Sequence, residues 1–272
     1  MKITFLGTGT SQGVPVIACS CEVCHSSDSH DKRLRTSALV TDCEGNNVLI
    51  DIGPDFRSQM LTHDVRHLEA ILITHAHRDH VGGIDDIRPL NWVQQRNMEV
   101  YANSEALDSL KHDYHYIFEP HIYPGLPEVT LHDVSDCRPF KIGLLTITPI
   151  RGMHKDLPVL GYRLDEQKCS SSRNTKDSLA VNSLVYITDM NHIFSEDKDK
   201  LCSLDILVIN SLRKKQHFSH FCLPESLAVI EECKPRVAYL THMSHEMGLH
   251  SIVDPSLPEN VHLAYDGLSI IV

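Results

Sequence analysis

At 272 residues the chain is long enough for a substantial hydrophobic core, and we expect residues 1–272 to form a single domain. Its formal net charge of −11 argues against a general nucleic-acid-binding protein, which would need a basic face. No apolar run approaches the roughly 20 residues that span a bilayer, and Gly7 interrupts the first apolar run too early for a signal peptide. We therefore expect a cytoplasmic location and no membrane partner.

The N-terminal run Lys2–Gly7 has the composition of a short strand, and it leads into a glycine-containing loop, Thr8–Pro15. A glycine loop after a strand can bind phosphate, but this loop lacks the Gly-Lys-Ser/Thr sequence of a nucleotide-binding loop. We expect it to lie at the rim of a site formed elsewhere.

Three of the nine cysteines lie close together in the next segment, at Cys19, Cys21 and Cys24. Structural zinc takes four tetrahedral cysteine or histidine ligands, so this C-x-C-x₂-C cluster needs a fourth ligand from elsewhere. His25 and His30 are local candidates. Because no secretory signal is recognised, we expect metal-binding cysteines in a reducing compartment rather than a disulfide framework.

Two β-rich runs, Thr36–Thr41 and Asn47–Ile52, flank a turn and predict a hairpin. Asp51 lies near the end of the second run, and we expect its carboxylate to orient a metal-binding histidine rather than to bind a metal itself. A helix is expected to begin in Phe56–Leu61.

The strongest functional signal follows the run Glu69–Thr74, which is short, apolar and typical of a buried strand. Four residues that can bind metals come directly after it, namely His75, His77, Asp79 and His80. They lie where a strand ends and a loop begins, the place where open sheets bind their ligands. Imidazole and carboxylate groups suit zinc, iron or manganese, and this segment offers donors for two adjacent ions.

Helices are expected over Asp85–Gln95 and Ser104–Phe118, and several antiparallel strands over Glu128–Ile150. Trp92, the single tryptophan, is expected to be a packing anchor. The polar stretch Asp165–Ser183 is expected to form a long hairpin loop.

Later strands also end in histidine or aspartate. His154 follows one such strand, Asp189 ends a second and His242 ends the last buried one. His245 lies three residues beyond His242, so the two imidazoles can serve different sites. His245 is therefore the favoured fourth ligand of the cysteine cluster.

The spacing H-x-H-x-D-H behind a buried strand resembles the signature of the metallo-β-lactamase superfamily at every fixed position. The resemblance implies an α/β (α+β) fold, a four-layer αββα sandwich with a dinuclear metal centre at one edge. It also implies the ligand sets: His75, His77 and His154 hold one ion, Asp79, His80 and His242 hold the other, and Asp189 bridges the two.

The cysteine cluster, combined with a histidine just after the last catalytic ligand, resembles the PhnP-like phosphodiesterases. This resemblance implies hydrolysis of a small or cyclic phosphodiester, such as a ribose cyclic phosphate, by a hydroxide bound to two divalent ions (Mn or Zn). It also implies one structural zinc on Cys19, Cys21, Cys24 and His245. His220, four residues before Pro224, corresponds to the family's general acid, with His217 as the alternative, and Asp79 is counted as catalytic as well as metal-binding.

Two other functions stay open at this point. A tRNA 3′-processing endonuclease would share the metal ligands but would need a basic surface or an RNA-clamping arm. A non-catalytic metal-binding or redox-sensing module would use the cysteine cluster alone. The sequence does not determine the substrate, the native metal, the oligomeric state (a homodimer is one option) or the role of the loop 165–183.

Overall fold

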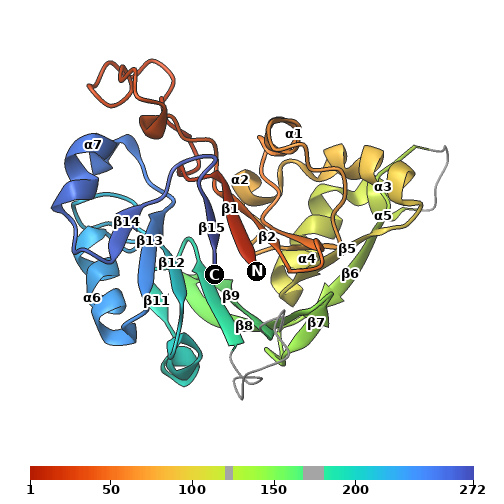
Figure 1. The fold of residues 1–272 in the computed structure, drawn as a ribbon. Coiled ribbons are helices and arrows are strands. Elements are labelled where there is room, and N and C mark those ends of the chain that lie inside the picture. Colours follow the sequence, from red (N-terminus) through yellow and green to blue (C-terminus); the bar gives the residue numbers. More distant parts are fainter. Residues whose placement is uncertain (120–124, 168–180) are drawn as a thin grey trace.

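The computed structural model describes residues 1–119, 125–167 and 181–272. In these residues two mixed β-sheets pack face to face, and helices cover the outer face of each sheet (Figure 1). The αββα architecture expected from the sequence is confirmed.

The first sheet comes mainly from the N-terminal half of the chain. Its strands are β1 (Lys2–Gly7), β2 (Ser37–Thr41), β3 (Asn47–Ile50), β4 (Ala70–Leu72), β5 (Met98–Ala102), β6 (Val129–Asp133) and β15 (Ser269–Ile271). They lie in the order β15-β1-β2-β3-β4-β5-β6, antiparallel as far as β3 and parallel from β3 to β6. The predicted hairpin forms β2 and β3. Of the antiparallel strands expected over Glu128–Ile150, the pairing is wrong for β6, which runs parallel to β5 because a helical crossover separates the two.

The second sheet comes from the C-terminal half. Its strands are β7 (Phe140–Ile142), β8 (Leu145–His154), β9 (Leu157–Gln167), β10 (Val181–Ile187), β11 (His192–Ile193), β12 (Ile206–Asn210), β13 (Val237–Thr241) and β14 (Val261–Leu263). They lie in the order β11-β8-β9-β10-β12-β13-β14, with β7 paired to β8, and the pairs from β10 to β14 are parallel. Most of the predicted polar loop, residues 168–180, lies outside the described residues.

Helices flank both sheets, and most of them are short. The α-helices are α1 (Phe56–Thr62), α2 (Arg78–Val81), α3 (Arg88–Gln94), α4 (Ser104–Asp113), α5 (His115–Phe118), α6 (Leu223–Cys233) and α7 (His250–Val253). The 3₁₀ turns are η1 (Ser29–Asp31), η2 (Ile84–Ile87), η3 (Ser195–Leu201), η4 (His245–Met247) and η5 (Asp254–Ser256). Among the described residues, no helix has the length and apolar character that crossing a membrane requires. Trp92 is 63% exposed, so the expectation that it anchors the packing is wrong.

The parallel strands are apolar on both faces because each face packs on a different layer. In β12, Ile206 and Val208 join the core between the two sheets, whereas Leu207 and Ile209 pack under the helices of the outer layer. The same alternation occurs in β4, where Ile71 faces the helices of the first sheet. This packing fixes which strand ends meet at the edge of the sandwich.

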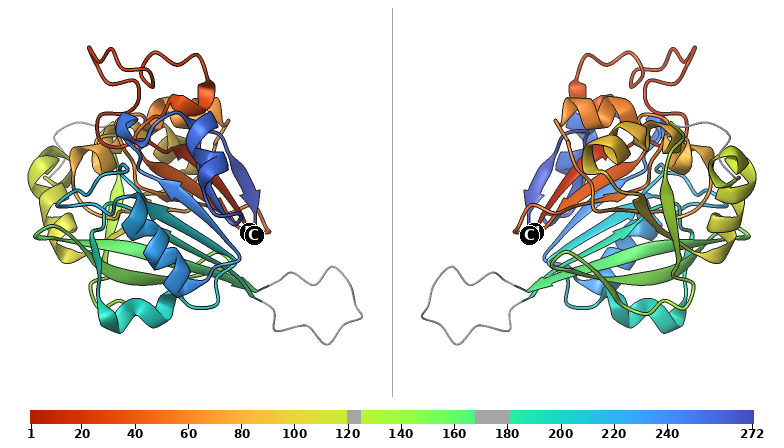
Figure 2. Two further views of the ribbon diagram at one scale, coloured as in Figure 1. Left: turned by 90° about the vertical axis from the view of Figure 1, so that its left-hand side faces the viewer. Right: turned by 90° about the vertical axis from the view of Figure 1, so that its right-hand side faces the viewer.

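The segment between β1 and β2 carries the clustered cysteines and extends away from the rest of the fold (Figure 2). Cys19, Cys21 and Cys24 are free thiols. Cys43 is disulfide-bonded, whereas Cys137, Cys202, Cys222 and Cys233 are free. The clustered cysteines are thus not part of a disulfide framework.

Candidate metal centre

The predicted H-x-H-x-D-H motif connects the end of β4 to α2. His75 lies in the connection and is buried, and α2 places Asp79 in its first turn with His80 directly after it. The loop after β3 packs tightly on this helix, since a Cβ at Gly53 would lie 2.2 Å from the carbonyl oxygen of Asp79. Gly53 is therefore required for the close approach that brings the two segments together.

The first predicted ligand set converges on one place. The Nε2 atom of His75 lies 3.0 Å from Nδ1 of His77. His154, the last residue of β8, comes in from the other sheet, with ring centroids 5.7 Å from His75 and 5.2 Å from His77. The three histidine rings thus lie next to one another. Among the described residues, the donor atoms that come together at this centre belong to two sets, His75, His80 and Asp189 in one and His154, Asp189 and His220 in the other.

The second predicted set surrounds Asp189. Its Oδ2 atom lies 3.0 Å from Nε2 of His80 and 3.1 Å from Nδ1 of His242, and His80 Nε2 is also 3.2 Å from Oδ2 of Asp79. Asp189 and His242 follow strand ends with φ of 53° and 55°, in the left-handed region that residues other than glycine seldom adopt. Such a conformation turns each side chain back toward the sheet edge, and strained residues of this kind cluster at functional sites.

Two buried nitrogen atoms test whether these residues fit a metal. Nε2 of His80 and Nδ1 of His242 are buried and have no hydrogen-bond partner among the residues that the structure describes, although both lie within about 3 Å of carboxylate oxygens. Buried polar atoms are normally hydrogen-bonded, so these nitrogens aim at a point between the residues rather than at each other. Neutral imidazoles and carboxylates arranged in this way fit divalent cations.

Neighbouring groups fix the orientation of the histidines. The carboxylate of Asp51 lies 2.7 Å from Nδ1 of His80, which confirms the orienting role expected for it. Nδ1 of His154 lies 2.8 Å from the carbonyl oxygen of Ser219, to which it donates. In both residues this leaves Nε2 to face the centre, the usual arrangement of a metal-binding histidine.

The protonation states of the buried carboxylates and histidines favour a bound cation at the centre. Burial disfavours a protonated His80, but the carboxylates of Asp189, Asp51 and Asp79 outweigh burial and hold its pKa well above the usual value. Burial favours a neutral Asp189, but His242 and His80 hold its pKa well below the usual value. Asp189 thus stays ionised in a buried site, where bound cations would compensate its charge.

His220 lies inside this centre rather than at its rim. It is buried, its Nε2 atom lies 2.8 Å from Oδ1 of Asp189, and its ring centroid is 4.5 Å from that of His154. The alternative residue, His217, lies behind it, with Nδ1 3.3 Å from Nδ1 of His220. Of the two histidines, the structure brings only His220 against Asp189.

The cysteine cluster and His245 form a separate site. Nδ1 of His245 lies 3.3, 3.2 and 3.5 Å from the Sγ atoms of Cys19, Cys21 and Cys24. The backbone N–H of Cys24 lowers the pKa of Cys21 to about 6, while burial raises that of Cys24 to about 11. Four cysteine and histidine donors around one point fit tetrahedral zinc. His25 stays outside, with its Nδ1 on the carbonyl oxygen of Cys21.

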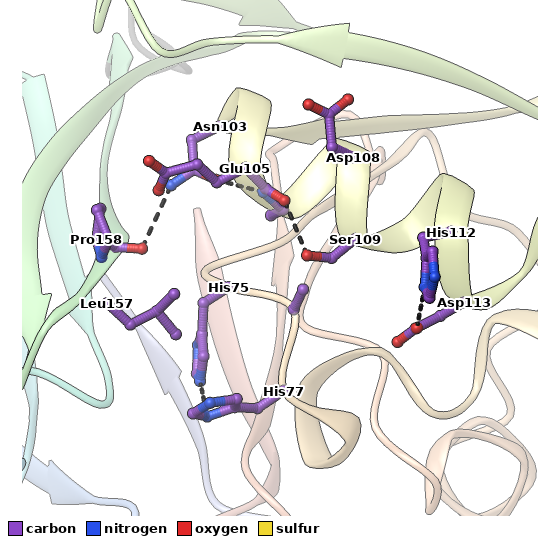
Figure 3. Close-up of a pocket in the computed structure, with 12 residues that line it drawn as sticks. His75, His77, Asn103, Glu105, Asp108, Ser109, His112, Asp113, Leu157 and Pro158 are labelled. Atoms are coloured by element: carbon purple, nitrogen blue, oxygen red, sulfur yellow. Dashed lines mark hydrogen bonds and ion pairs between the residues drawn. The ribbon is translucent and has the colours of Figure 1, made fainter.

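A cavity of about 410 Å³ opens beside the first ligand set. His75 and His77 form one wall, α4 forms the opposite wall, and Leu157 and Pro158 close one end (Figure 3). Among the described residues that line the cavity, Glu105, Asp108 and Asp113 carry acids and none is lysine or arginine.

Two contributors to the site were not predicted. Thr74 donates its backbone N–H to Asp51 Oδ1 and its hydroxyl to Asp51 Oδ2, both at 2.8 Å, and so fixes the group that orients His80. Asn210 holds the turn after Asp189, since its side chain bonds both the N–H and the carbonyl oxygen of Met190. A polar residue at the end of buried β12 was the available signal for Asn210.

Comparisons with known proteins agree with this geometry. Residues 46–243 match a family model described as the beta-lactamase superfamily domain. A diphosphatase from the PhnP family has a crystal structure with a TM-score of 0.85 and 35% identity, over 99% of this chain and 96% of that one. Zinc-bound PqqB from Methylobacterium extorquens, at 15% identity and a TM-score of 0.77 over the whole of both chains, shares the fold.

An octanoyltransferase of Porphyromonas gingivalis is 40% identical over 273 residues, covering all of this chain and 52% of that protein. The chain thus spans about half the length of this curated relative. The family model and the full-length similarity to the diphosphatase show that the chain belongs to the PhnP family of metal-dependent hydrolases, within the metallo-β-lactamase superfamily.

Proposed function

We propose that this hydrolase is a phosphodiesterase that cleaves a small or cyclic phosphodiester, such as a ribose cyclic phosphate, with two divalent ions. The observation that carries the proposal is the arrangement around Asp189, whose Oδ2 faces His80 and His242 while Oδ1 faces His220 on the side of His154. One carboxylate between two groups of donors is suited to two adjacent cations, which stabilise both the attacking and the leaving oxygen of a phosphoryl group. The similarity to a diphosphatase supports a phosphate-containing substrate.

In this proposal each donor has one role. His75, His77 and His154 would hold one ion, Asp79, His80 and His242 would hold the other, and Asp189 would serve both. When bound, the ions act as Lewis acids and lower the pKa of coordinated water toward neutrality. Zinc and manganese both suit imidazole and carboxylate donors, so the metal-resolved assay described below is needed to distinguish them.

The chain's own residues then position and move protons. Asp51 and the Ser219 carbonyl oxygen hold His80 and His154 in place. Nε2 of His220 donates to Asp189 in the resting site and can turn its proton toward a departing alkoxide. A positioned general acid of this kind is typically worth about 10²–10⁴-fold in rate.

The cavity beside His75 and His77 supports a small substrate rather than tRNA. Its volume of about 410 Å³ suits a small molecule, and its acidic wall on α4 would repel the many charges of a polyphosphate backbone far more than the single charge of one phosphodiester. The net charge of −11 points the same way. We therefore disfavour the tRNA 3′-processing alternative.

We also propose that the cysteine cluster binds a structural zinc ion. Its four donors would fill the four tetrahedral positions of the ion, so none is left for a substrate. A purely metal-binding or redox-sensing module would not need a second, separate set of histidines around a cavity. We further propose that the enzyme acts in the cytoplasm without a membrane or nucleic-acid partner, either alone or as a homodimer.

A metal-resolved turnover screen tests the proposal. Protein cleared of exchangeable metal is reconstituted with zinc or manganese and assayed on a ribose cyclic phosphate, bis(4-nitrophenyl) phosphate, a thioester, a lactam and a tRNA precursor. We expect turnover of the phosphodiesters only, and its loss in Asp189→Asn but not in Asp136→Asn, which changes an exposed aspartate. Turnover confined to the thioester, the lactam or the tRNA precursor would contradict the proposal.

A further inference from the structure

An exposed aromatic ring, that of Phe218, lies in the same segment as His220 and has no role in the chemistry described above. We call Phe218 and the neighbouring Lys155 the lip of the centre. Phe218 is 69% exposed, two residues before the buried His220. Its ring centroid lies 4.6 Å from that of His217, which in turn lies 5.2 Å from that of His220. The ring of Phe218 therefore contacts that of His217, and His217 contacts His220, the residue that lies against Asp189.

The backbone beneath this ring is fixed. The side chain of Asn191 donates to the carbonyl oxygen of Phe218 at 3.0 Å and accepts the backbone N–H of Lys155 at 3.1 Å. Asn191 follows Asp189 by two residues, and Lys155 follows His154 directly. Three turns that adjoin the centre are thus tied together, and they fix the backbone that carries the ring.

A cation accompanies the ring. Nζ of Lys155 lies 5.7 Å from the ring centroid of Phe218, within the range of a cation–π contact, and its charge is partly balanced by Asp156 at 3.4 Å. Both the lysine and Asp156 are exposed, so the ammonium group is available to an incoming ligand. The lip therefore combines an apolar face with hydrogen-bond donors.

We propose that Phe218, with Lys155 beside it, is a stacking platform for the nucleobase of a nucleoside phosphodiester. The proposal rests on the phosphodiesterase function above and narrows its substrate to esters that carry a base. Single exposed apolar side chains are common on protein surfaces, so exposure alone carries little weight. A largely exposed ring on a fixed backbone, next to the proposed phosphoryl-binding centre, is different, because flat heteroaromatic bases stack on such rings without needing a specific sequence. The lysine can then donate to base carbonyl oxygens.

Two substrates that share a leaving group, only one of which carries a nucleobase, measure the contribution of the base. The holoenzyme is assayed on thymidine 5′-(4-nitrophenyl phosphate) and on methyl 4-nitrophenyl phosphate, and the selectivity is the ratio of their kcat/KM values. Because base stacking is worth about 1–3 kcal/mol, Phe218→Ala should lower this ratio roughly tenfold. Phe218→Tyr, which keeps the ring, should restore it. Trp92→Ala, which removes another exposed aromatic on α3, should leave the ratio unchanged.

Equilibrium binding gives a second measurement that does not depend on turnover. Uridine 5′-monophosphate and ribose 5-phosphate differ by the base, and calorimetry should show a roughly tenfold weaker affinity for the nucleotide in Phe218→Ala. The affinity for ribose 5-phosphate serves as the reference. An unchanged selectivity ratio together with unchanged nucleotide binding would overturn the platform. If the wild-type protein hydrolyses neither diester, the phosphodiesterase function fails, and the binding comparison still decides whether the platform exists.

Discussion

Nε2 of His220 lies 2.8 Å from Oδ1 of Asp189, so the residue proposed as proton donor contacts the carboxylate proposed to join the two metals. Its Nδ1 atom lies 2.9 Å from the hydroxyl of Ser219, and the carbonyl of that same serine orients His154. One short segment between β12 and α6 therefore positions a candidate acid and a candidate ligand together.

Replacing His220 with alanine should slow the hydrolysis of esters with poor leaving groups much more than that of activated ones. An alkoxide must be protonated as it departs, whereas a nitrophenolate leaves unaided. We expect about a 10²–10⁴-fold loss in kcat/KM on an alkyl or cyclic ribose phosphodiester and a much smaller loss on bis(4-nitrophenyl) phosphate.

His217→Ala is the matched control, since His217 contacts His220 but not Asp189. It should show a far smaller dependence on the leaving group. Metal content, measured by elemental analysis, should be unchanged in His220→Ala; a lost ion would place His220 among the ligands instead.

The zinc cluster gives a second prediction. His245→Ala removes the nitrogen around which three Sγ atoms converge, so the variant should retain one tightly held zinc fewer after mild chelation. The segment between β1 and β2 should then become more susceptible to proteolysis, because it extends away from the body and the cluster attaches it (Figure 2).

His25→Ala offers the comparison for this experiment. His25 lies one residue beyond Cys24, but its ring bonds the carbonyl oxygen of Cys21 and not the cluster. Zinc retention should therefore match that of the unmodified protein. If both variants keep their zinc, the four-ligand site is wrong.

The H-x-H-x-D-H motif could be located from the sequence because its residues lie within one short segment at a strand end. The more distant donors, His154, Asp189 and His242, were found only through the resemblance to the family. Local pattern could not show that Asp51 reaches His80, since that contact depends on a left-handed residue after β3 and on the close packing at Gly53. The position of Phe218 near the centre could not be predicted either, because the sequence around an exposed aromatic residue is the same whether or not a site lies nearby.

The boundaries of elements were less predictable than their existence. The helix expected over Asp85–Gln95 divides into η2 and α3, and the one expected over Ser104–Phe118 divides at Tyr114. In both cases apolar residues continue across the break, and tertiary packing decides where the helix ends. The parallel pairing of β6 likewise depends on a crossover that periodicity does not report.

A third prediction concerns the group behind the metals. Asp51→Asn should leave the fold intact, because asparagine tolerates the φ of 60° found there. It removes the negative charge that orients His80, and changes of this kind typically cost about 10–100-fold in metal affinity. A metal titration followed by calorimetry would measure the loss.

Asp64 provides the control for this change. It also has a positive φ, of 49°, but it is exposed and pairs with Arg66 away from the centre. Asp64→Asn should bind metal as the unmodified protein does. Equal losses in the two variants would indicate a general effect of substitution rather than the orientation of His80.

The last prediction concerns stability and pH at a buried cluster that joins the loop after β1 to the C-terminal segment. Nη1 of buried Arg33 donates to the hydroxyl of Thr8 and to the carbonyl oxygen of Ala264, while Asp266 accepts from Thr8 and from the N–H of Leu34. Burial raises the pKa of Asp266 to about 6, against an ordinary value of 3.8. The folded protein therefore binds this proton more tightly than the unfolded chain does.

An acid whose pKa rises on folding contributes its full stability below the unfolded value and loses it as the pH passes the folded value. Relative to Asp266→Asn, the unmodified protein should thus become less stable between about pH 4 and pH 7, by at most about 3 kcal/mol at about 1.4 kcal/mol per pKa unit. The measurement is the difference in melting temperature between the two proteins across this range. Protonation of the metal ligands affects both proteins alike, so it cancels in the difference. A difference that stays constant with pH, or that grows in favour of the unmodified protein, would show that Asp266 is already ionised when the chain folds.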